Sequence, residues 1–300
     1  MMRPKLTCIV ISHNMKREIP RTIRSLSPCL QKGINKSDYE ILLIENGSKE
    51  YCDHRELHCW GANITSISMC APKKTPVFAI NYGLELAKGE ICGVLIDGAR
   101  MVTPGLLNRV LAASKTHPRA IIATIGFHLG PKHQSLSAKE GYNQSVEDYL
   151  LNKIDWSADP YRLFEIAVFA GSSPRGWFGE TLESNALFMA KEMWDELGGY
   201  EERFTTPGGG LANLDVFKRA LNLPDSQLVI LLGEGTFHQY HSGETTGDAP
   251  SKWGIFSKEY LDIRAKPYTP SNSSPIYFGS ISKHDAKFVE MSAKFLYSAR

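Results

Sequence analysis

Three short polar clusters hold the residues of this chain that are best suited to bind a charged ligand. They occupy residues 12–14, 45–48 and 97–100, and each directly follows a run of apolar residues. Glu45 and Asp97 supply carboxylates, whose oxygens accept hydrogen bonds and suit hard divalent cations. The clusters therefore predict one polar site, provided that the fold brings them together.

Buried strands are expected to position these clusters. Apolar runs of strand length occupy residues 6–11, 39–44, 64–69 and 91–96. Between them, Ile19, Ile23 and Leu26 recur at helical spacing until Pro28, and a second helical pattern runs over residues 77–87. This alternation predicts an α/β fold with a mostly parallel central sheet and helices on both faces. Such sheets bind ligands at the carboxyl ends of their strands, where all three clusters should meet.

The rest of the chain is less regular. Further strands are expected at residues 120–124, 184–189 and 227–232, the last followed by a glycine-containing loop over 233–237. Thr103 and Pro104 predict a helix N-terminus, and another helix is expected to begin near Asn213 or Leu214. Residues 126–175 are expected to wrap the substrate side. Beyond residue 250 we expect an extension packed on the core, with a helix over residues 285–298.

Composition excludes several classes of protein. The 300 residues carry a formal net charge of +2 without a dense basic block, which argues against nucleic-acid binding. No apolar stretch approaches the roughly 20 residues of a membrane helix, and no signal peptide is evident, so the expected location is cytoplasmic with peripheral membrane contact left open. The six cysteines form no C-x-x-C pair, which argues against a zinc site. Neither G-x-G-x-x-G nor a P-loop is present, which argues against a dinucleotide oxidoreductase and P-loop chemistry.

Five motifs, in order and with matching spacing, resemble the family 2 glycosyltransferases of GT-A fold over roughly residues 5–245. They are Ser12-His13-Asn14, Glu45-Asn46-Gly47-Ser48, Asn81-Tyr82-Gly83 with Ala87-Lys88-Gly89-Glu90, Leu95-Ile96-Asp97-Gly98-Ala99, and Leu197-Gly198-Gly199-Tyr200-Glu201-Glu202-Arg203-Phe204. The resemblance implies a GT-A nucleotide-diphospho-sugar transferase fold. It divides the chain into a nucleotide-sugar-binding half (1–115), an acceptor-binding half of the same domain (116–249) and a C-terminal extension (250–300).

The resemblance also implies how a sugar donor linked to UDP or GDP would be held. The donor-binding residues it predicts are Ser12, Asn14, Glu45, Asn46, Asn81, Asp97 and Arg100. Asp97 and His238 would hold Mn²⁺ or Mg²⁺ at the diphosphate, with His241 as a weaker candidate ligand. One departure concerns the metal, because Ala99 stands where the family's D-x-D motif has its second aspartate. Arg100 could replace part of the cation's charge or could lie in a solvent-facing turn.

Two carboxylates compete for the role of catalytic base. Asp215 matches the second aspartate of the family's E-D-x-D segment, although Asn213 stands at the position of the usual base. Glu183 is the alternative, at the start of a strand beside the acceptor. With either base, the expected reaction moves a hexosyl or related sugar to a hydroxyl of a glycan or other acceptor, with inversion. The alternative function is a degenerate relative that binds a nucleotide or glycan without catalysis.

Overall fold

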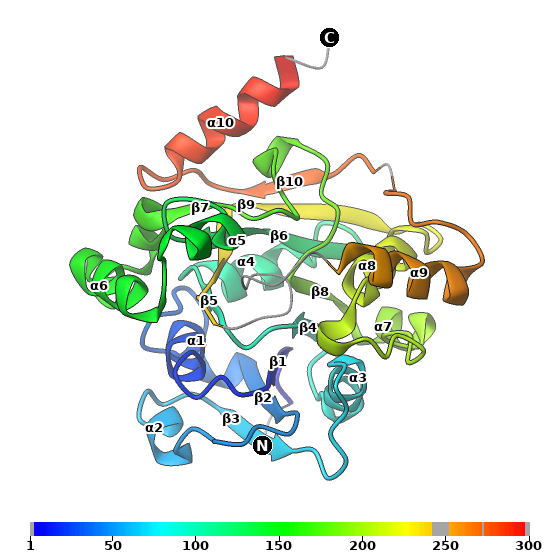
Figure 1. Ribbon diagram of the computed structural model, residues 1–300, viewed down its shortest axis with the longest axis horizontal. Helices are drawn as coiled ribbons and strands as arrows, with labels where there is room; N and C mark the ends of the chain where they lie inside the picture. Colours follow the sequence, from blue (N-terminus) through cyan, green and yellow to red (C-terminus); the bar gives the residue numbers. More distant parts are fainter. Residues whose placement is uncertain (1–2, 242–251, 272, 298–300) are drawn as a thin grey trace.

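The computed structural model describes residues 3–241, 252–271 and 273–297, and its centre is a twisted sheet (Figure 1). Its strands are β1 (Leu6–Ser12), β2 (Tyr39–Glu45), β3 (Ile64–Ser68), β4 (Ile91–Leu95), β5 (Arg100–Val102), β6 (Ala120–Leu129), β7 (Ala167–Phe169), β8 (Ala186–Ala190), β9 (Gln227–His238) and β10 (Ile276–Gly279). The α-helices are α1 (Ile19–Leu26), α2 (His54–His58), α3 (Val77–Leu86), α4 (Leu106–Ala113), α5 (Gln134–Ser137), α6 (Gln144–Ile154), α7 (Lys191–Leu197), α8 (Ala212–Leu221), α9 (Trp253–Arg264) and α10 (Ala286–Tyr297).

The sheet is mixed. Its order is β10-β9-β6-β8-β4-β1-β2-β3, with β5 paired to β9 and β7 paired to β6. The strands β4, β1, β2 and β3 are parallel to one another, as are β6, β9 and β10. β8 runs antiparallel between these two groups. The predicted α/β class is therefore confirmed, and the parallel pattern holds on either side of β8.

Alternation of side chains along the strands divides the core into two layers. On one face, Ile9 and Ile44 pack with Ile80 of α3. On the other face, Val10 and Leu43 pack with Ile23 of α1 and with α4. Because every residue of β1 and β2 is buried, both faces of the sheet must be covered, as the continuous apolar runs predict.

Several elements differ from the expectation. β9 continues to His238, through residues 233–237, which were expected to form a loop. Gly233 and Gly235 lie inside the strand because neighbours approach them closely: an added Cβ would meet Ser280 backbone or the ring of Phe127. Glycine therefore marks close packing here and not a strand end. The expected 285–298 helix is α10, whose last expected residue lies outside the described part of the chain.

The expected helix N-terminus at Thr103 is displaced. α4 begins at Leu106, with Gly105 as its N-cap. The Thr103 hydroxyl instead accepts a hydrogen bond from the backbone of Gly235 in β9, at 3.2 Å. The sequence-based assignment has no counterpart of β5, β7, β10 or α9. β5 and β7 are only three residues long, and β10 and α9 form from segments whose apolar residues show a weak pattern.

The C-terminal segment is joined to the sheet. β10 adds a parallel strand beside β9, and Phe288 of α10 packs edge-on against Phe127 of β6. Figure 1 shows α10 projecting beyond the sheet, with the C-terminus at its far end. The predicted division of the chain into three parts remains a prediction.

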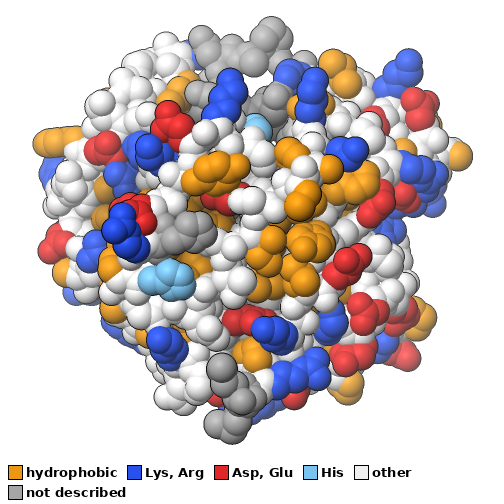
Figure 2. All heavy atoms as spheres, turned by 90° about the horizontal axis from the view of Figure 1, so that it is seen from below, with side chains coloured by type: hydrophobic (Ala, Val, Ile, Leu, Met, Phe, Trp, Pro, Cys, Tyr) orange, Lys and Arg blue, Asp and Glu red, His pale blue; other side chains and the backbone are white. Residues whose placement is uncertain are grey.

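The described residues include no helix with the length and apolarity needed to cross a bilayer. On the face seen in Figure 2, acidic and basic side chains are interspersed around hydrophobic ones. This arrangement fits the near-neutral net charge of +2.

Candidate active site

The first two polar clusters meet where β1 and β2 end. Ser12 and Glu45 are register partners in these parallel strands, and the backbone N–H of Asn46 donates to the carbonyl of Ser12 at 2.8 Å. The ring of His13 is hydrogen-bonded through Nδ1 to the carbonyl of Asn46, also at 2.8 Å. Ser12 is buried, and its backbone joins the two strand ends.

The carboxylate of Glu45 is held at this junction. Ser48 donates its hydroxyl proton to Glu45 Oε2 at 2.7 Å and accepts the backbone N–H of Asn14 at 2.9 Å. Asn14 adopts a left-handed conformation with φ of 55°, which asparagine tolerates better than most residues. Glu45 Oε1 makes no hydrogen bond within the described residues, so one oxygen is left for a ligand.

Two of the predicted donor-binding amides are engaged by the protein itself. Asn46 donates to the carbonyls of Lys73 and Thr75 at 2.9 and 3.3 Å. Asn81 brackets the backbone of Tyr200, donating to its carbonyl at 2.9 Å and accepting its N–H at 2.8 Å. Asn81 thereby fastens α3 to the segment after α7. Direct contact of these two amides with a donor remains a prediction.

The third cluster meets the end of β9 at a group of potential metal ligands. His238 Nε2 lies 2.8 Å from Asp97 Oδ2, and His241 Nε2 lies 3.4 Å from the same oxygen and 3.1 Å from His238 Nε2. One ligand atom from each residue falls within 4.8 Å of the others. Asp97 and His238 are thus brought together as predicted, and His241 joins them from three residues further along.

A second layer of hydrogen bonds fixes the orientation of His238. Gln134, which is fully buried, donates through Nε2 to the carbonyl of His238 at 2.8 Å. Its Oε1 therefore faces His238 Nδ1, at 2.5 Å, and accepts a proton from it. With the ring proton on Nδ1, the lone pair of Nε2 points at Asp97 and His241. Carbonyl groups orient metal-binding histidines in this way.

The charges at this cluster favour a cation between the three side chains. Burial lowers the pKa of His238 to about 4, so its ring is neutral near pH 7. Burial acts to raise the pKa of Asp97, but the neighbouring His241, whose own pKa Asp97 raises against its burial, leads the effects that outweigh it and hold the pKa of Asp97 well below its usual range. A carboxylate oxygen and an imidazole lone pair 2.8 Å apart repel each other unless a proton or a metal ion lies between them. The donor set therefore fits a divalent cation.

Arg100 lies beside the cluster in the interior. Its side chain is 9% exposed, and its Nη2 is 3.9 Å from Asp97 Oδ2. Nε and Nη1 are buried and make no hydrogen bond within the described residues. Burial lowers the pKa of Arg100, against the opposing effect of Asp97 and Glu183. The alternative of a solvent-facing turn is wrong for Arg100, which has two N–H groups available to an anion.

Glu183 lies near Arg100 and is held by Asn213, the residue that stands at the position of the family's usual base. Asn213 donates to Glu183 Oε2 at 2.7 Å, and Tyr200 donates to Asn213 Oδ1 at 3.0 Å. Burial raises the pKa of Glu183, while Asn213 and Arg100 act to lower it. Its second oxygen has no partner among the described residues, so Glu183 keeps one oxygen that could accept a proton.

The other candidate base, Asp215, is enclosed by arginines. It is 1% exposed, and Arg219 donates to its Oδ2 at 2.8 Å. Arg264 of α9 donates to both carboxylate oxygens, at 2.6 and 2.7 Å. Both oxygens are therefore occupied in joining α8 to α9, which favours Glu183 as the base.

Two residues at this site, Gln134 and His128, were missed at the sequence level. Gln134 begins a four-residue helix in an irregular stretch, and His128 lies at the end of β6, beyond its expected extent. The spacing of the histidines was a usable signal. Four of the nine histidines in the chain form two close pairs, at residues 128 and 133 and at residues 238 and 241.

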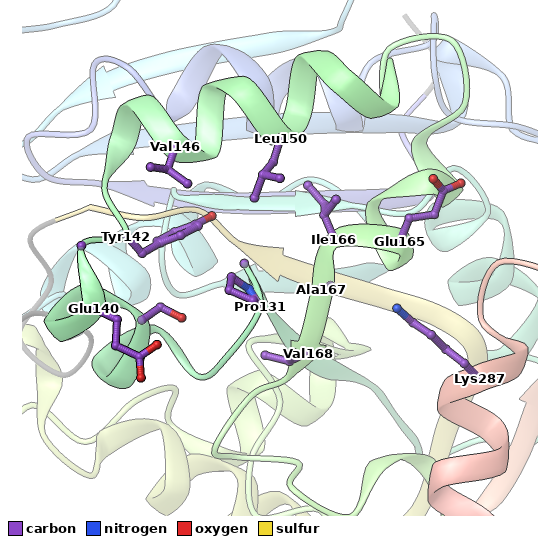
Figure 3. Close-up of a pocket in the computed structure, with 13 residues that line it drawn as sticks. Pro131, Glu140, Tyr142, Val146, Leu150, Glu165, Ile166, Ala167, Val168 and Lys287 are labelled. Atoms are coloured by element: carbon purple, nitrogen blue, oxygen red, sulfur yellow. The ribbon is translucent and has the colours of Figure 1, made fainter.

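A cavity of about 630 Å³ lies apart from these residues (Figure 3). Its walls include Tyr142, Val146 and Leu150 on one side and Ile166 and Lys287 on the other. None of the predicted site residues lines it. Trp177 lies in neither place, because it is fully buried in the core, where its indole N–H donates to the carbonyl of Leu231.

Comparison with known proteins was made at the level of sequence and of structure. No protein-family model matches the sequence, and no curated protein matches it. Among solved structures, S. aureus TarS 1–349 in complex with UDP-GlcNAc superposes with a TM-score of 0.54 at 14% identity, over 97% of this chain and 71% of that one. GalNAc-T7 with UDP, GalNAc and Mn²⁺ gives a TM-score of 0.56 at 13% identity, over 88% of this chain and 48% of that one.

The fold is of GT-A type. The predicted GT-A fold is thereby confirmed, and the structural neighbours are glycosyltransferases that use nucleotide-sugars. At these identities the likeness establishes the fold, and membership of family 2 remains a prediction.

Proposed function

We propose that this protein is a glycosyltransferase that moves a hexosyl or related sugar from a UDP- or GDP-linked donor to a hydroxyl acceptor, with inversion. The observation that carries the proposal is the cluster of Asp97, His238 and His241 beside the unpaired N–H groups of buried Arg100. Together they form a site for a divalent cation and an anion at the strand ends of a GT-A fold. A diphosphate bound through Mn²⁺ or Mg²⁺ has these two requirements.

The cation ligands account for the missing second aspartate of the family's motif. Ala99 offers no ligand, but His241 places Nε2 within 3.4 Å of Asp97 Oδ2. The Ala99 position is itself fully buried, with its backbone N–H bonded to Asp97 Oδ1 at 2.9 Å. His241 therefore takes the role of third ligand, and the bound cation would neutralise charge on the departing diphosphate.

The remaining steps are assigned to residues of the chain. Glu45 Oε1 accepts a hydrogen bond from the nucleoside, and Arg100 donates Nε and Nη1 to the diphosphate. Glu183 takes the proton of the acceptor hydroxyl while the oxygen of that hydroxyl forms a bond to the anomeric carbon. The bond from that carbon to the phosphate oxygen breaks, and the electron pair leaves with the nucleoside diphosphate. Asn213 orients Glu183 through its 2.7 Å hydrogen bond.

Thermal unfolding in the presence of ligands tests the donor site. We expect Mn²⁺ together with UDP or GDP to raise the melting temperature of the wild-type protein, since a ligand at 100 times its Kd adds about 2.7 kcal/mol. His241→Ala should remove most of the metal-dependent part of the shift. His58→Ala, which alters an exposed histidine of α2, is the matched control and should behave as wild type.

Turnover separates catalysis from binding alone. Release of the nucleoside diphosphate from a sugar donor, dependent on Mn²⁺ or Mg²⁺, is expected for the wild type. Binding without any turnover would instead support the degenerate, non-catalytic alternative, which Ala99 and Asn213 suggested. Absence of any nucleotide- or metal-dependent shift would overturn the proposed site. The cytoplasmic location, family 2 membership and the nature of the acceptor stay predictions.

A further inference from the structure

The third candidate cation ligand, His241, is not held by a strand. His238 is the last residue of β9, and Gln134 fixes its ring. His241 follows three residues later, beyond the strand, and within the described residues its side chain is hydrogen-bonded to Asp97 and His238. A ligand atom has to be kept close to its bonding position for a cation to bind tightly. Contacts to the 239–241 segment must therefore fix His241.

Gln239 fastens the start of this segment to the core. Its backbone N–H donates to the carbonyl of Ala99 at 2.8 Å. Its fully buried side chain donates through Nε2 to the carbonyl of Glu18 at 3.1 Å and to the hydroxyl of Thr22 at 3.2 Å. Because Glu18 is the N-cap of α1, the chain just before His241 is tied to the start of that helix.

Glu147 of α6 holds the next residue, Tyr240. The carboxylate of Glu147 is fully buried, and its Oε2 accepts the backbone N–H of Tyr240 at 2.6 Å. The carbonyl of Tyr240 accepts a hydrogen bond from Nη1 of Arg17 at 3.3 Å, and Nη2 of the same guanidinium donates to Glu147 Oε1 at 3.2 Å. Glu147 and Arg17 therefore fix the peptide groups on both sides of Tyr240, and the second of these groups leads directly to His241.

Aromatic packing supports the same contact. The rings of Tyr142 and Tyr240 meet edge-on, with centroids 5.7 Å apart, and the Tyr142 hydroxyl donates to Glu147 Oε2 at 3.3 Å. Both oxygens of Glu147 are thus engaged by neighbouring groups. A buried carboxylate is costly unless such hydrogen bonds satisfy it, so Glu147 is itself held in place by the groups that it fixes.

We propose that Glu147 is a positioning residue of the cation site: together with Arg17 it fixes the Tyr240 peptide groups and so aims His241 Nε2 at the cation. This inference rests on the proposed function, because the cation is part of it. Glu147 lies in the 126–175 stretch that was expected to wrap the substrate side, and the inference gives this stretch a part in cation binding. Groups that orient metal ligands typically contribute about 10–100-fold to metal affinity.

Glu147→Gln tests the inference directly. Glutamine has nearly the same shape but only one side-chain oxygen, so its NH₂ group must face a donor, either the N–H of Tyr240 or Arg17. We expect Mn²⁺ to bind the folded variant about tenfold more weakly than the wild type. Calorimetry on the full chain measures this, with Mn²⁺ titrated alone and in the presence of UDP. Asp148→Asn is the matched control, since Asp148 also pairs with Arg17, at 2.7 Å, and should leave Mn²⁺ affinity as in the wild type.

The same substitution in a His241→Ala background distinguishes positioning from general stability. Positioning acts through His241, so Glu147→Gln should cause little further loss of Mn²⁺ affinity once that ligand is gone. A fall in melting temperature that comes from packing should appear in both backgrounds. If Glu147→Gln does not fold, Arg17→Lys gives a second test. Its single ammonium group cannot reach the Tyr240 carbonyl and Glu147 as the guanidinium does, and Mn²⁺ affinity should again fall only when His241 is present.

The outcomes separate this inference from the proposed function. If the wild type binds Mn²⁺ and the folded variants bind it equally well, Glu147 does not position His241, and the cation site itself stands. Equal losses of Mn²⁺ affinity with and without His241 also overturn the inference, because Glu147 would then support the site as a whole. A wild-type protein that binds no Mn²⁺, with or without UDP, overturns the proposed cation site and the positioning role together.

Discussion

The contrast between two arginine–carboxylate regions of this molecule separates stability from function. At the junction of α8 and α9, Asp215 has both oxygens paired with Arg219 and Arg264, and Arg264 also lies 3.2 Å from Glu201. Around Arg100 the same kinds of side chain are left incomplete: Nε and Nη1 have no partner in the described structure.

The similar burial of Asp215 and Arg100 makes this contrast informative. A buried charge without hydrogen bonds is expensive, so a fold retains one where a ligand completes it. Asp215 and Arg100 are almost equally buried, at 1% and 8% exposed, yet only Asp215 is satisfied within the protein. Burial does not distinguish the two roles, whereas the remaining hydrogen-bonding capacity does.

The largest expected effect comes from Glu183→Gln. This change keeps the shape of the side chain and can keep a hydrogen bond to Asn213, but it removes the group that accepts a proton. We expect kcat to fall by about 10²–10⁴, the usual contribution of a general base, with donor binding and melting temperature unchanged. Steady-state kinetics alongside calorimetry measures both. If kcat is retained, Glu183 is not the base.

A pH profile of the wild type adds an independent test of the same residue. Because burial raises the pKa of Glu183, its basic form should be lost at a higher pH than for an ordinary glutamate. The activity of the wild type should therefore fall on the acidic side at a pH above 4.5. An acidic limb at or below the ordinary glutamate value would contradict the assignment.

The next effect is on stability. Asp215→Asn leaves Arg219 and Arg264 facing a neutral amide in the interior, and breaking a buried ion pair in this way costs about 3 kcal/mol. We expect a lower melting temperature, measured by circular dichroism, with residual kcat in the folded fraction close to wild type. A variant that is fully stable but inactive would reverse the comparison and restore Asp215 as the base.

How far the sequence predicts this arrangement depends on whether a feature is local. The strands β1, β2 and β4 follow from continuous apolar runs, and their ends follow from the polar residues at 12, 45 and 97. The chemistry of β5, β6 and β9 could not be predicted in this way, because Arg100, His238 and His128 become neighbours only through strand register.

The competition between Glu183 and Asp215 shows the same limit. Both are carboxylates near strand or helix starts, and motif position favoured Asp215. Its pairing depends on Arg264, 49 residues away in a helix that the sequence pattern did not predict. Long-range partners of this kind decide whether a charged side chain is free to act.

A smaller effect tests the nucleoside end of the site. Glu45→Gln can still accept a hydrogen bond from Ser48, and Glu45 is only 5% exposed, so the strand ends should keep their geometry. Loss of the charge should weaken UDP or GDP binding about tenfold, equivalent to ~1.4 kcal/mol. Calorimetry of the diphosphate measures this. An unchanged affinity would mean that Glu45 serves only the turn that follows β2.

The smallest effect concerns Glu201 at the paired junction. Hydrogen bonding from Arg203, at 2.6 Å, lowers the pKa of Glu201 to about 2. A carboxyl whose pKa is lower in the folded protein stabilises it above the unfolded value near 4.5, and this contribution is lost as the pH falls toward 2. Since the Arg203 side chain is 60% exposed, solvent screening limits the contribution to about 0.5 kcal/mol.

Denaturant unfolding should therefore show a small gap in the free energy of unfolding between wild type and Glu201→Gln at pH 7. This gap should narrow below pH 4.5, as wild-type Glu201 takes up its proton. Glu85→Gln, at an exposed glutamate of α3, is the control and should show neither the gap nor its pH dependence. A gap that persists unchanged to pH 3 would mean that Glu201 acts through packing and not through its charge. The junction would then owe its stability to Asp215 alone among these acids, which would sharpen the contrast with Arg100.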